Sequence, residues 1–407
     1  MTFDDTPEEA AYRAAAREWI ATHRERIGDG GDAPAGSAAH LERMRHWQRL
    51  KAKSGYACIA WPKAIGGGGG TPIQQAIFDQ EEAREGLSST YFMTGQKICL
   101  PPLLKHGSEE QRARFIAPAV RGDEIWCQLF SEPGNGSDLA AARTRAVRAG
   151  GDWRVDGQKV WNSHADRSDF GLLLARTDPD ALKHAGLTMF WIDMRTPGVD
   201  ARPLRQMNGG AEFNEVYLDG VVLRDDQRVG EVGEGWAVAL TTLANERAAL
   251  GGGGGPTWRD LLALACKVPS GDGTMADDPV FGRKLADFHV EAESFRLFGL
   301  RMLSKVSRGD VPGPEAAAAK LIWSNHVQAL SAAAVELAGD FGMIADPAIA
   351  PLGGAFQARL MWAPGLRIGG GTDEILRNII AERVLGLPAD ARSDKGIPFR
   401  EIPQGAL

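Results

Sequence analysis

The amino-acid sequence predicts an α+β fold in three successive domains, helical over residues 1–125, built of β-strands over 126–232, and helical again over 233–407. Two observations support this prediction. Short segments of two-residue alternation, broken by glycine and aspartate, gather between 126 and 232. The flanking regions instead carry helical composition with start and stop signals. At 407 residues the chain is long enough for two or three domains.

Helices are expected throughout the first domain. The segment at 6–9 joins a capping threonine, a proline and two acidic residues, which is a favourable helix start. Residues 109–120 predict a second helix. The five consecutive glycines at 66–70 predict a loop, because glycine loses much backbone entropy when it is fixed in a helix or strand.

The middle domain is expected to be a sheet of short strands. Residues 152–157 and 159–161 alternate with a period of two and are broken by aspartate and glycine, which predicts a hairpin. Further short strands are expected at 172–177, 187–192 and 215–218. Several short strands separated by turns predict a small antiparallel barrel or sandwich.

The third domain is expected to be an antiparallel helical bundle. A helix from Pro314 to Leu337 carries an apolar face and stops at Gly339. A last helix is expected to start at Thr372 and to end at Gly386. Long helices without intervening strands are typical of a bundle.

Composition excludes several functional classes. A formal net charge of −7 argues against a nucleic acid or an anionic membrane as the main partner. The four cysteines are far apart in the sequence and the histidines lack metal-ligand spacing, so neither a disulfide scaffold nor a metal site is expected. The acidic start lacks a signal-peptide pattern, and no apolar run approaches membrane-spanning length. These features predict a soluble, cytoplasmic protein.

A glycine- and serine-containing loop at 128–138 is a candidate binding loop. Gly134 and Gly136 allow backbone amides to approach a ligand, and Ser131 and Ser137 add hydroxyl groups. Alone, this pattern fits a plain surface turn equally well. Its place between two strands, the first of which starts at Trp126, favours binding.

Four motifs give the chain a specific resemblance. The segments at 127–138, 157–163, 230–236 and 371–377 resemble the flavin signature and C-terminal motifs of acyl-CoA dehydrogenases, in the same order along nearly the whole chain. The resemblance implies a helical N-terminal domain, a middle β-barrel domain and a C-terminal four-helix bundle. It also implies an oxidoreductase that uses FAD, an acyl-CoA substrate and an electron-transfer flavoprotein as acceptor. A homotetramer or dimer is implied, and a heterotetramer of two different chains stays open.

The resemblance assigns cofactor and substrate contacts to individual residues. It implies that Gln128, Phe130 and Ser131 line the isoalloxazine ring, that Trp161 covers one of its faces and that Ser163 donates a hydrogen bond to it. Thr372 and Glu374 are implied to lie along the FAD, and Ser137 to touch the CoA portion of the substrate. The alternative for Trp161 is a core tryptophan in a strand.

The catalytic base is expected at an unusual position. Many members of the family carry a glutamate just before the Gly-Thr of the C-terminal motif, but this chain has Gly370 there, which keeps only a backbone N–H for the thioester oxygen. A minority carry the base on an earlier helix, just before an arginine, and this pattern matches Glu246 and Arg247. We therefore expect Glu246, at the start of a helix, to take the α-proton, and Arg247 to support CoA or the helix. The alternatives are a solvated helix-start acid and a surface salt bridge.

Two glycine runs suggest a large substrate. Glycines at 369–371 and 251–255 remove side-chain volume where the acyl group is expected. Relatives with the base on the earlier helix accept branched, long or bulky acyl groups. A sterol side chain or a fatty acid undergoing β-oxidation is therefore the substrate hypothesis. Simple helix packing or a kink is the alternative for the second run.

Two departures from the family pattern bear on FAD. Asp278 stands where an FAD-contacting arginine is usual, and Glu336 stands where a glutamine is usual. Negative charge beside a pyrophosphate would weaken binding. A non-catalytic partner subunit of a heteromeric enzyme is therefore an alternative, and a flavin monooxygenase on the same fold is another.

Overall fold

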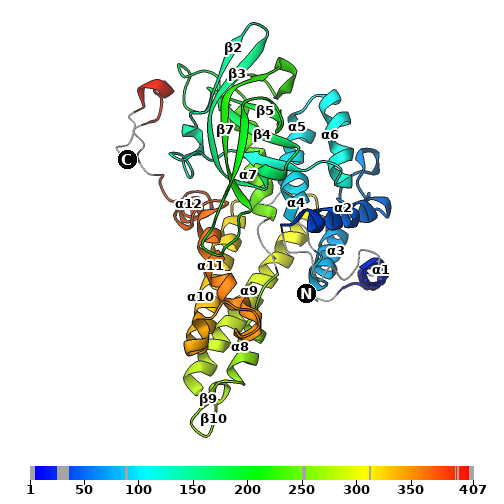
Figure 1. Ribbon diagram of the computed structural model, residues 1–407, viewed down its shortest axis with the longest axis vertical. Coiled ribbons are helices and arrows are strands. Elements are labelled where there is room, and N and C mark those ends of the chain that lie inside the picture. Colours follow the sequence, from blue (N-terminus) through cyan, green and yellow to red (C-terminus); the bar gives the residue numbers. More distant parts are fainter. Residues whose placement is uncertain are drawn as a thin grey trace. The chain divides into compact units, whose positions relative to one another are not determined.

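The computed structural model describes residues 5–24, 36–87, 90–249, 254–310, 313–389, 391 and 394–402. Contacts divide the chain into two compact units (Figure 1). The β-containing unit is drawn from residues 2–206, 210–249 and 390–407, and the bundle unit from 207–209 and 250–389. The predicted domain boundaries at 125 and 232 stay a prediction.

Helices make up the first part of the β-containing unit, as the sequence predicted. They are α1 (Pro7–Arg24), α2 (Ala38–Lys53), α3 (Pro72–Arg84), α4 (Thr90–Met93), α5 (Leu100–His106) and α6 (Glu109–Arg121). A π-helical segment, Thr94–Cys99, joins α4 to α5. At the start of α1, the Glu9 N–H donates to the Thr6 hydroxyl at 3.2 Å and the Thr6 N–H donates to the Glu9 carboxylate at 2.8 Å. The expected cap is therefore confirmed.

The glycine run at 66–70 forms a loop, as predicted, and its glycines are also needed for space. A Cβ at Gly67 would lie 2.4 Å from the Trp61 carbonyl oxygen, and one at Gly68 would lie 2.3 Å from the Gly55 carbonyl oxygen. Side chains at either position would force the loop apart.

An eight-stranded sheet follows the helices, in the order β6-β7-β3-β2-β4-β5-β8 with β1 beside β4. Its strands are β1 (Trp126–Leu129), β2 (Arg145–Ala149), β3 (Asp152–Ser163), β4 (Phe170–Arg176), β5 (Leu187–Asp193), β6 (Val199–Leu204), β7 (Phe213–Leu223) and β8 (Arg228–Val229). The β domain is confirmed, but the expectation of purely antiparallel pairing is wrong. β4 pairs in parallel with both β1 and β2. β1 enters the sheet from the helical region and not through a hairpin, so it is free to run parallel to β4.

Both faces of the sheet are covered by apolar packing. β4 is buried along its whole length, so its alternate side chains supply two cores. Leu172 and Leu174 belong to one core with residues of α5 and α6, whereas Leu173 belongs to another core with Phe190 of β5 and Val216 of β7. Figure 1 shows α5 and α6 lying beside β4 and β5. A strand that is buried on both faces has a continuous apolar run in its sequence, and β4 has such a run.

The helix that carries Glu246 is α7 (Gly235–Ala249), which packs against the π-helical segment, α5 and β5. The expectation that Glu246 opens this helix is wrong, because the helix begins at Gly235 and Glu246 lies near its C-terminal end. The helix dipole disfavours a carboxylate at that end. The alternative interpretation, an acid favoured at a helix start, therefore fails as well.

The bundle unit contains four longer helices, namely α8 (Trp258–Ala265), α9 (Pro279–Ser307), α10 (Ala316–Leu337) and α11 (Ala355–Ile368). A short hairpin of β9 (Pro269–Ser270) and β10 (Gly273–Thr274) lies between α8 and α9. α12 (Asp373–Ile379) continues into a π-helical turn, Ile380–Val384. The four helices share a core that includes Leu261, Phe288, Leu330 and Phe356, which confirms the predicted bundle.

The last described residues, 394–402, return to the β-containing unit. The N–H groups of Phe399 and Arg400 donate to the carbonyls of Ala181 and Pro179, at 2.9 and 3.0 Å. The Phe399 ring lies 3.6 Å from the guanidinium carbon of the buried Arg176. We call residues 394–402 the C-terminal segment.

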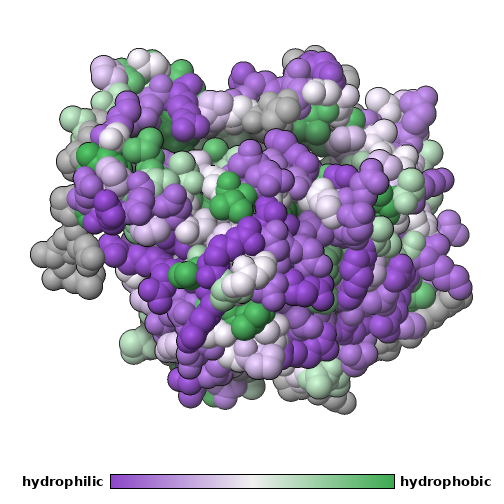
Figure 2. Space-filling view, turned by 90° about the horizontal axis from the view of Figure 1, so that it is seen from above, coloured by the Kyte–Doolittle hydropathy of each residue, from purple (hydrophilic) through white to green (hydrophobic). Residues whose placement is uncertain are grey.

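The face drawn in Figure 2 is mainly hydrophilic, and its described apolar residues gather only in small groups. This agrees with the charged composition of the chain. Among the described helices, none combines the length and hydrophobicity that crossing a lipid bilayer requires.

Candidate active site

The Glu246 carboxylate lies against β1 and the π-helical segment. The Gln128 side chain donates from Nε2 to Glu246 Oε2 at 3.2 Å. Burial raises the pKa of the Cys99 thiol well above its ordinary value, and the neighbouring Cys127 and Glu246 add to that effect. Glu246 is half-buried. A π-helical segment often marks a functional site, and here it carries Cys99, which interacts electrostatically with the carboxylate.

Two buried asparagines support Gln128 from behind. Asn162 of β3 donates from Nδ2 to the Gln128 carbonyl at 2.7 Å, and Asn214 of β7 donates to the Asn162 carbonyl at 3.0 Å. The Oδ1 atoms of both asparagines are buried without a hydrogen-bond partner within the structure as described. Sequence reasoning missed both residues, although two asparagines inside apolar strands were a visible signal.

Trp161 is a surface residue with an unusual backbone. Its φ of 62° lies in the left-handed region, at an irregularity where the register of β3 and β7 shifts between Lys159 and Asn162. Its side chain is 60% exposed and meets the Phe213 ring edge-on at 6.0 Å. The alternative interpretation of a core tryptophan is therefore wrong. A bulky residue in this conformation is strained, and such strain gathers at functional sites.

The other predicted flavin contacts of this unit lie around Trp161. The Val160 N–H donates to the Ser131 carbonyl at 2.9 Å, which brings Ser131 to the end of β3. Ser131 and Ser163 are both half-buried. Phe130, in contrast, is 4% exposed and packs in the core beneath them, so its side chain supports this surface.

A buried ion pair holds the loop that follows β1. Lys159 Nζ lies 2.8 Å from Glu132 Oε1 and also donates to the Phe130 carbonyl at 3.0 Å. Glu132 accepts from the N–H groups of Arg143 and Thr144 at 2.7 and 2.8 Å. Burial opposes ionisation of Glu132, but Lys159 and the two backbone donors outweigh it and lower its pKa. Burial also lowers the pKa of Lys159, against the pull of Glu132. We take the pair as charged, because the Glu132 carboxylate has three donors.

Ser137 lies at the exposed end of this loop. Ser137 is exposed, and a Cβ at Gly134 or Gly136 would meet nothing within 4 Å. The adjacent Asp138 pairs with Lys183 at 2.6 Å, and Lys183 also pairs with Asp394 of the C-terminal segment at 2.5 Å. The loop is therefore exposed at its glycines and at Ser137, and it is held by the ion pair of Asp138 with Lys183.

The remaining predicted residues belong to the bundle unit. Gly370 and Gly371 have φ values of 66° and 96°, which only glycine adopts readily. Thr372 caps α12, its hydroxyl accepting from the Ile375 N–H at 3.2 Å, and Glu374 is exposed. The side chain of Arg247 lies outside the described residues, as do residues 251–253 of the second glycine run.

The two acidic departures have structural roles of their own. Asp278 caps α9 and accepts from the N–H groups of Val280 and Phe281 at 2.8 and 2.9 Å. The Glu336 side chain is 79% exposed and lies 3.4 Å from Lys284. Asp278 is thus explained by helix capping, and Glu336 is a solvated surface charge.

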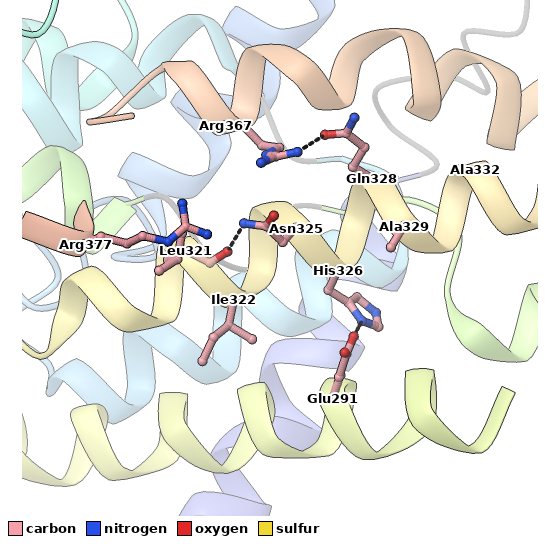
Figure 3. Close-up of a pocket in the computed structure, with 10 residues that line it drawn as sticks. All are labelled: Glu291, Leu321, Ile322, Asn325, His326, Gln328, Ala329, Ala332, Arg367 and Arg377. Atoms are coloured by element: carbon pink, nitrogen blue, oxygen red, sulfur yellow. Dashed lines mark hydrogen bonds and ion pairs between the residues drawn. The ribbon is translucent and has the colours of Figure 1, made fainter. Parts of the chain in front are cut away.

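A hollow of about 600 Å³ on the bundle unit is a further candidate (Figure 3). Four of its polar side chains form two pairs. His326 contacts Glu291 at 2.8 Å, and Arg367 donates to Gln328 at 3.2 Å. Side chains paired in this way offer a ligand little. Residues lining it come from α9 to α12, and the full set is Glu291, Leu321, Ile322, Asn325, His326, Gln328, Ala329, Ala332, Arg367 and Arg377.

Comparison with known families matches most of the chain. The acyl-CoA dehydrogenase N-terminal domain matches residues 6–123, the middle domain matches 127–221 and the C-terminal domain matches 233–385. These matches confirm the family resemblance and the three-part α+β fold expected from the sequence.

Similar proteins bear the same family name. Acyl-CoA dehydrogenase FadE34 of Mycobacterium tuberculosis is 40% identical over 339 residues, which cover 83% of this chain and 45% of that protein. The chain thus spans less than half of that relative. Acyl-CoA dehydrogenase IpdE1 of the same organism is 34% identical over 394 residues, covering 94% of this chain and 98% of that protein.

Solved structures resemble the whole chain. The structure described as "Tcur3481-Tcur3483 steroid ACAD" has a TM-score of 0.80 and 27% identity, covering 96% of this chain and 100% of that one. The ChsE4-ChsE5 complex from Mycobacterium tuberculosis has a TM-score of 0.79 and 28% identity, with the same coverage.

Proposed function

Because the chain belongs to the acyl-CoA dehydrogenase family of oxidoreductases, we propose that it catalyses α,β-dehydrogenation of an acyl-CoA thioester with Glu246 as the base. The observation that carries this proposal is the setting of Glu246. A half-buried carboxylate sits at the unfavourable end of α7, against Gln128 and the π-helical segment. The helix dipole does not favour an acid at this position, and a carboxylate partly withdrawn from water is what proton abstraction requires.

The chemistry asks two things of the chain. An α-proton beside a thioester is weakly acidic, so the base must be partly withdrawn from water, and the developing negative charge on the thioester oxygen needs hydrogen-bond donors. Glu246 supplies the first, and it takes the proton on its carboxylate. Gly370 supplies a backbone N–H for the second and, having no side chain, cannot be the base.

The residues around Trp161 fit a flat aromatic cofactor such as FAD. The indole is exposed on a strained backbone, and Ser131 and Ser163 offer hydroxyl groups nearby. We propose that these residues and Gln128 hold the ring of FAD, and that Thr372 and Glu374 lie along the cofactor. Bound FAD would accept the hydride that leaves the β-carbon. Ser137 and Arg247 are proposed for the CoA portion.

A bulky or branched acyl group is the proposed substrate class. Two consecutive glycines in left-handed conformation, Gly370 and Gly371, leave no side chain beside the proposed thioester site. A structural relative is described as a steroid ACAD, which supports a sterol side chain. An electron-transfer flavoprotein in the cytoplasm is proposed as the acceptor. A homotetramer, a dimer or a heterotetramer is the proposed assembly, the last supported by a relative solved as a two-protein complex.

The test is the substitution Glu246→Gln in the purified, FAD-loaded protein. We expect the flavin absorbance to be retained and its anaerobic bleaching by a panel of acyl-CoAs to fall by at least about a thousandfold. Glu231→Gln is the matched control, since the Glu231 side chain is 79% exposed and pairs with Arg228 at 3.2 Å. If the flavin of Glu246→Gln is bleached at the original rate, then Glu246 is not the catalytic base.

A non-catalytic partner subunit is the second candidate function. Acidic residues at Asp278 and Glu336, where the family usually has an arginine and a glutamine, favour it. The deciding observation is the absorption spectrum of purified protein after FAD is added. Protein that stays colourless yet forms a stable complex with a related dehydrogenase chain would support this candidate over the first.

A further inference from the structure

We propose that Gln128 is a positioning residue that orients the Glu246 carboxylate and keeps it ionised, and that Asn162 and Asn214 hold Gln128 in place for this task. The proposal rests on the proposed function of Glu246 as the base. It gives the Gln128 side chain a role toward the base that is separate from its expected contact with the flavin.

The contact itself favours the charged base. The Gln128 amide donates from Nε2 to Glu246 Oε2 at 3.2 Å, with both side chains half-buried. A donor of this kind stabilises the carboxylate more than the protonated acid, because the negative oxygen is the stronger acceptor. It also fixes one oxygen, so the other keeps a constant direction toward a substrate.

The support behind Gln128 is buried and hydrogen-bonded. Asn162 and Asn214 are 2% and 0% exposed and face each other across the β3–β7 pairing. Their side chains donate in sequence, Asn214 to the Asn162 carbonyl and Asn162 to the Gln128 carbonyl. These two hydrogen bonds link the backbone of Gln128 to the β3–β7 pairing, so the strand that carries the Gln128 side chain is held from behind.

The titratable groups on the elements next to α7 include two cysteines and a histidine, and their charge states bear on the role of the Gln128 amide. Cys99 of the π-helical segment lies near Glu246 and, like Cys127 of β1, is a neutral thiol because burial raises its pKa. His106 of α5 contacts Thr241, and burial lowers its pKa. None of these three groups is therefore a cation at neutral pH, and Lys97, the cation of the π-helical segment, pairs with Asp79 of α3 at 2.9 Å. The Arg247 side chain is outside the described residues.

The test uses Gln128→Met in the FAD-loaded protein, with anaerobic flavin reduction by an active acyl-CoA followed across pH. Methionine keeps the length of the side chain and removes the donor. We expect the acid limb of the rate profile to move about one unit to higher pH, so that the rate below the original midpoint falls about tenfold. Gln158→Met, a half-buried glutamine on β3, is the matched control and should leave the profile in place.

The infrared carboxyl band assigned by difference to Glu246 gives a second readout, and its titration midpoint should move by the same amount. A titration midpoint of Glu246 that does not change in Gln128→Met would overturn the proposal. Loss of FAD with an unchanged midpoint would also overturn it, because Gln128 would then act only in binding the cofactor. If Gln128→Met does not fold, Gln128→Asn takes its place, with a shift of the same direction. A normal rate in Glu246→Gln would instead overturn the proposed function.

Discussion

At the scale of single residues, the Glu132–Lys159 pair determines whether the loop after β1 can hold its shape. Lys159 is fully buried, and Glu132 connects it to two backbone N–H groups across the loop. The two ends of this loop carry Ser131 and Ser137. Removing one partner leaves the other charge buried and uncompensated, which is far more costly than losing a surface pair.

Lys159→Met should lower the free energy of unfolding by about 3–5 kcal/mol, because Glu132 keeps its charge without its cation. Urea unfolding measures the change. Arg202→Met is the matched control, since Arg202 pairs with Asp200 at 2.6 Å with both side chains more than half exposed. It should cost less than about 1 kcal/mol. Equal effects of the two substitutions would contradict the argument.

The same pair predicts a pH dependence. The pKa of Glu132 is lowered on folding, so its contribution to stability is present above the unfolded value, about 4.3, and is lost as pH falls through the folded value. In Glu132→Gln the free energy of unfolding should therefore depend less on pH in this acidic window. Urea titrations at several pH values check this. If the pH dependence of the free energy of unfolding is the same in Glu132→Gln, then Glu132 does not contribute to acid unfolding.

Trp161 presents a conflict between stability and function. A left-handed backbone costs an ordinary residue about 1–2 kcal/mol, which Trp161→Gly would relieve while losing an edge-on ring contact of similar size. The free energy of unfolding should therefore change by less than about 1 kcal/mol. Bound FAD, measured by absorbance after gel filtration, should fall at least about tenfold. Trp161→Phe should keep most of it, and equal FAD retention in both variants would contradict the assigned role.

At the scale of elements, the C-terminal segment completes the β-containing unit. Arg176 donates to the carbonyls of Ala142, Lys183 and Ala140 at 3.3, 2.7 and 2.6 Å, and the Phe399 ring covers its guanidinium. A desolvated cation against an aromatic ring stabilises more than an exposed one does. The segment therefore fixes the strand that carries Arg176.

Phe399→Ala should lower the free energy of unfolding by about 2 kcal/mol through loss of this contact and of ring burial. Arg400→Ala is the control from the same segment, because Arg400 pairs with Asp180 at 2.7 Å with both side chains about 60% exposed. It should cost less than about 1 kcal/mol. Chemical denaturation compares the two, and a larger loss in the control would refute the assignment.

Several elements could be predicted from the sequence because their signals are local. A signal of only a few residues was enough to predict the cap at Thr6, the helix after Thr372 and the apolar run of β4. The start of α7 at Gly235 has no capping side chain before it, so the sequence does not mark it and the expected start at Glu246 is wrong. The parallel pairing of β1 with β4 was missed because pairing between distant strands leaves no local signal.

Only part of the candidate site could be predicted from the sequence. The motif around Ser131 and Trp161 pointed to a surface that the structure assembles within one unit. The exposure and strain of Trp161, and the support of Gln128 by Asn162 and Asn214, depend on contacts between distant strands. Such contacts become visible only once the sheet is formed.

At the scale of the whole molecule, the two units have separate hydrophobic cores. Phe190 belongs to a core of the sheet, and Phe356 belongs to the core of the bundle. Each unit can therefore unfold independently of the other, as compact units with their own cores do.

Calorimetry of the FAD-free protein should accordingly resolve two transitions. Phe356→Ala should lower the midpoint of one, and Phe190→Ala that of the other, each by an amount equivalent to about 3–5 kcal/mol. The two substitutions serve as controls for each other. A single transition that both variants shift alike would mean that the units unfold as one.

The place of the C-terminal segment also bears on how the protein is made. A ribosome adds about 5–20 residues each second, and amino-terminal regions fold first as they emerge. The strand holding Arg176 leaves early, yet Phe399 is among the last described residues to be synthesised. The sheet thus waits until residue 399 has left the ribosome before its buried guanidinium gains an aromatic cover. The unit that begins to appear first is therefore completed only after the residues of the bundle have been made.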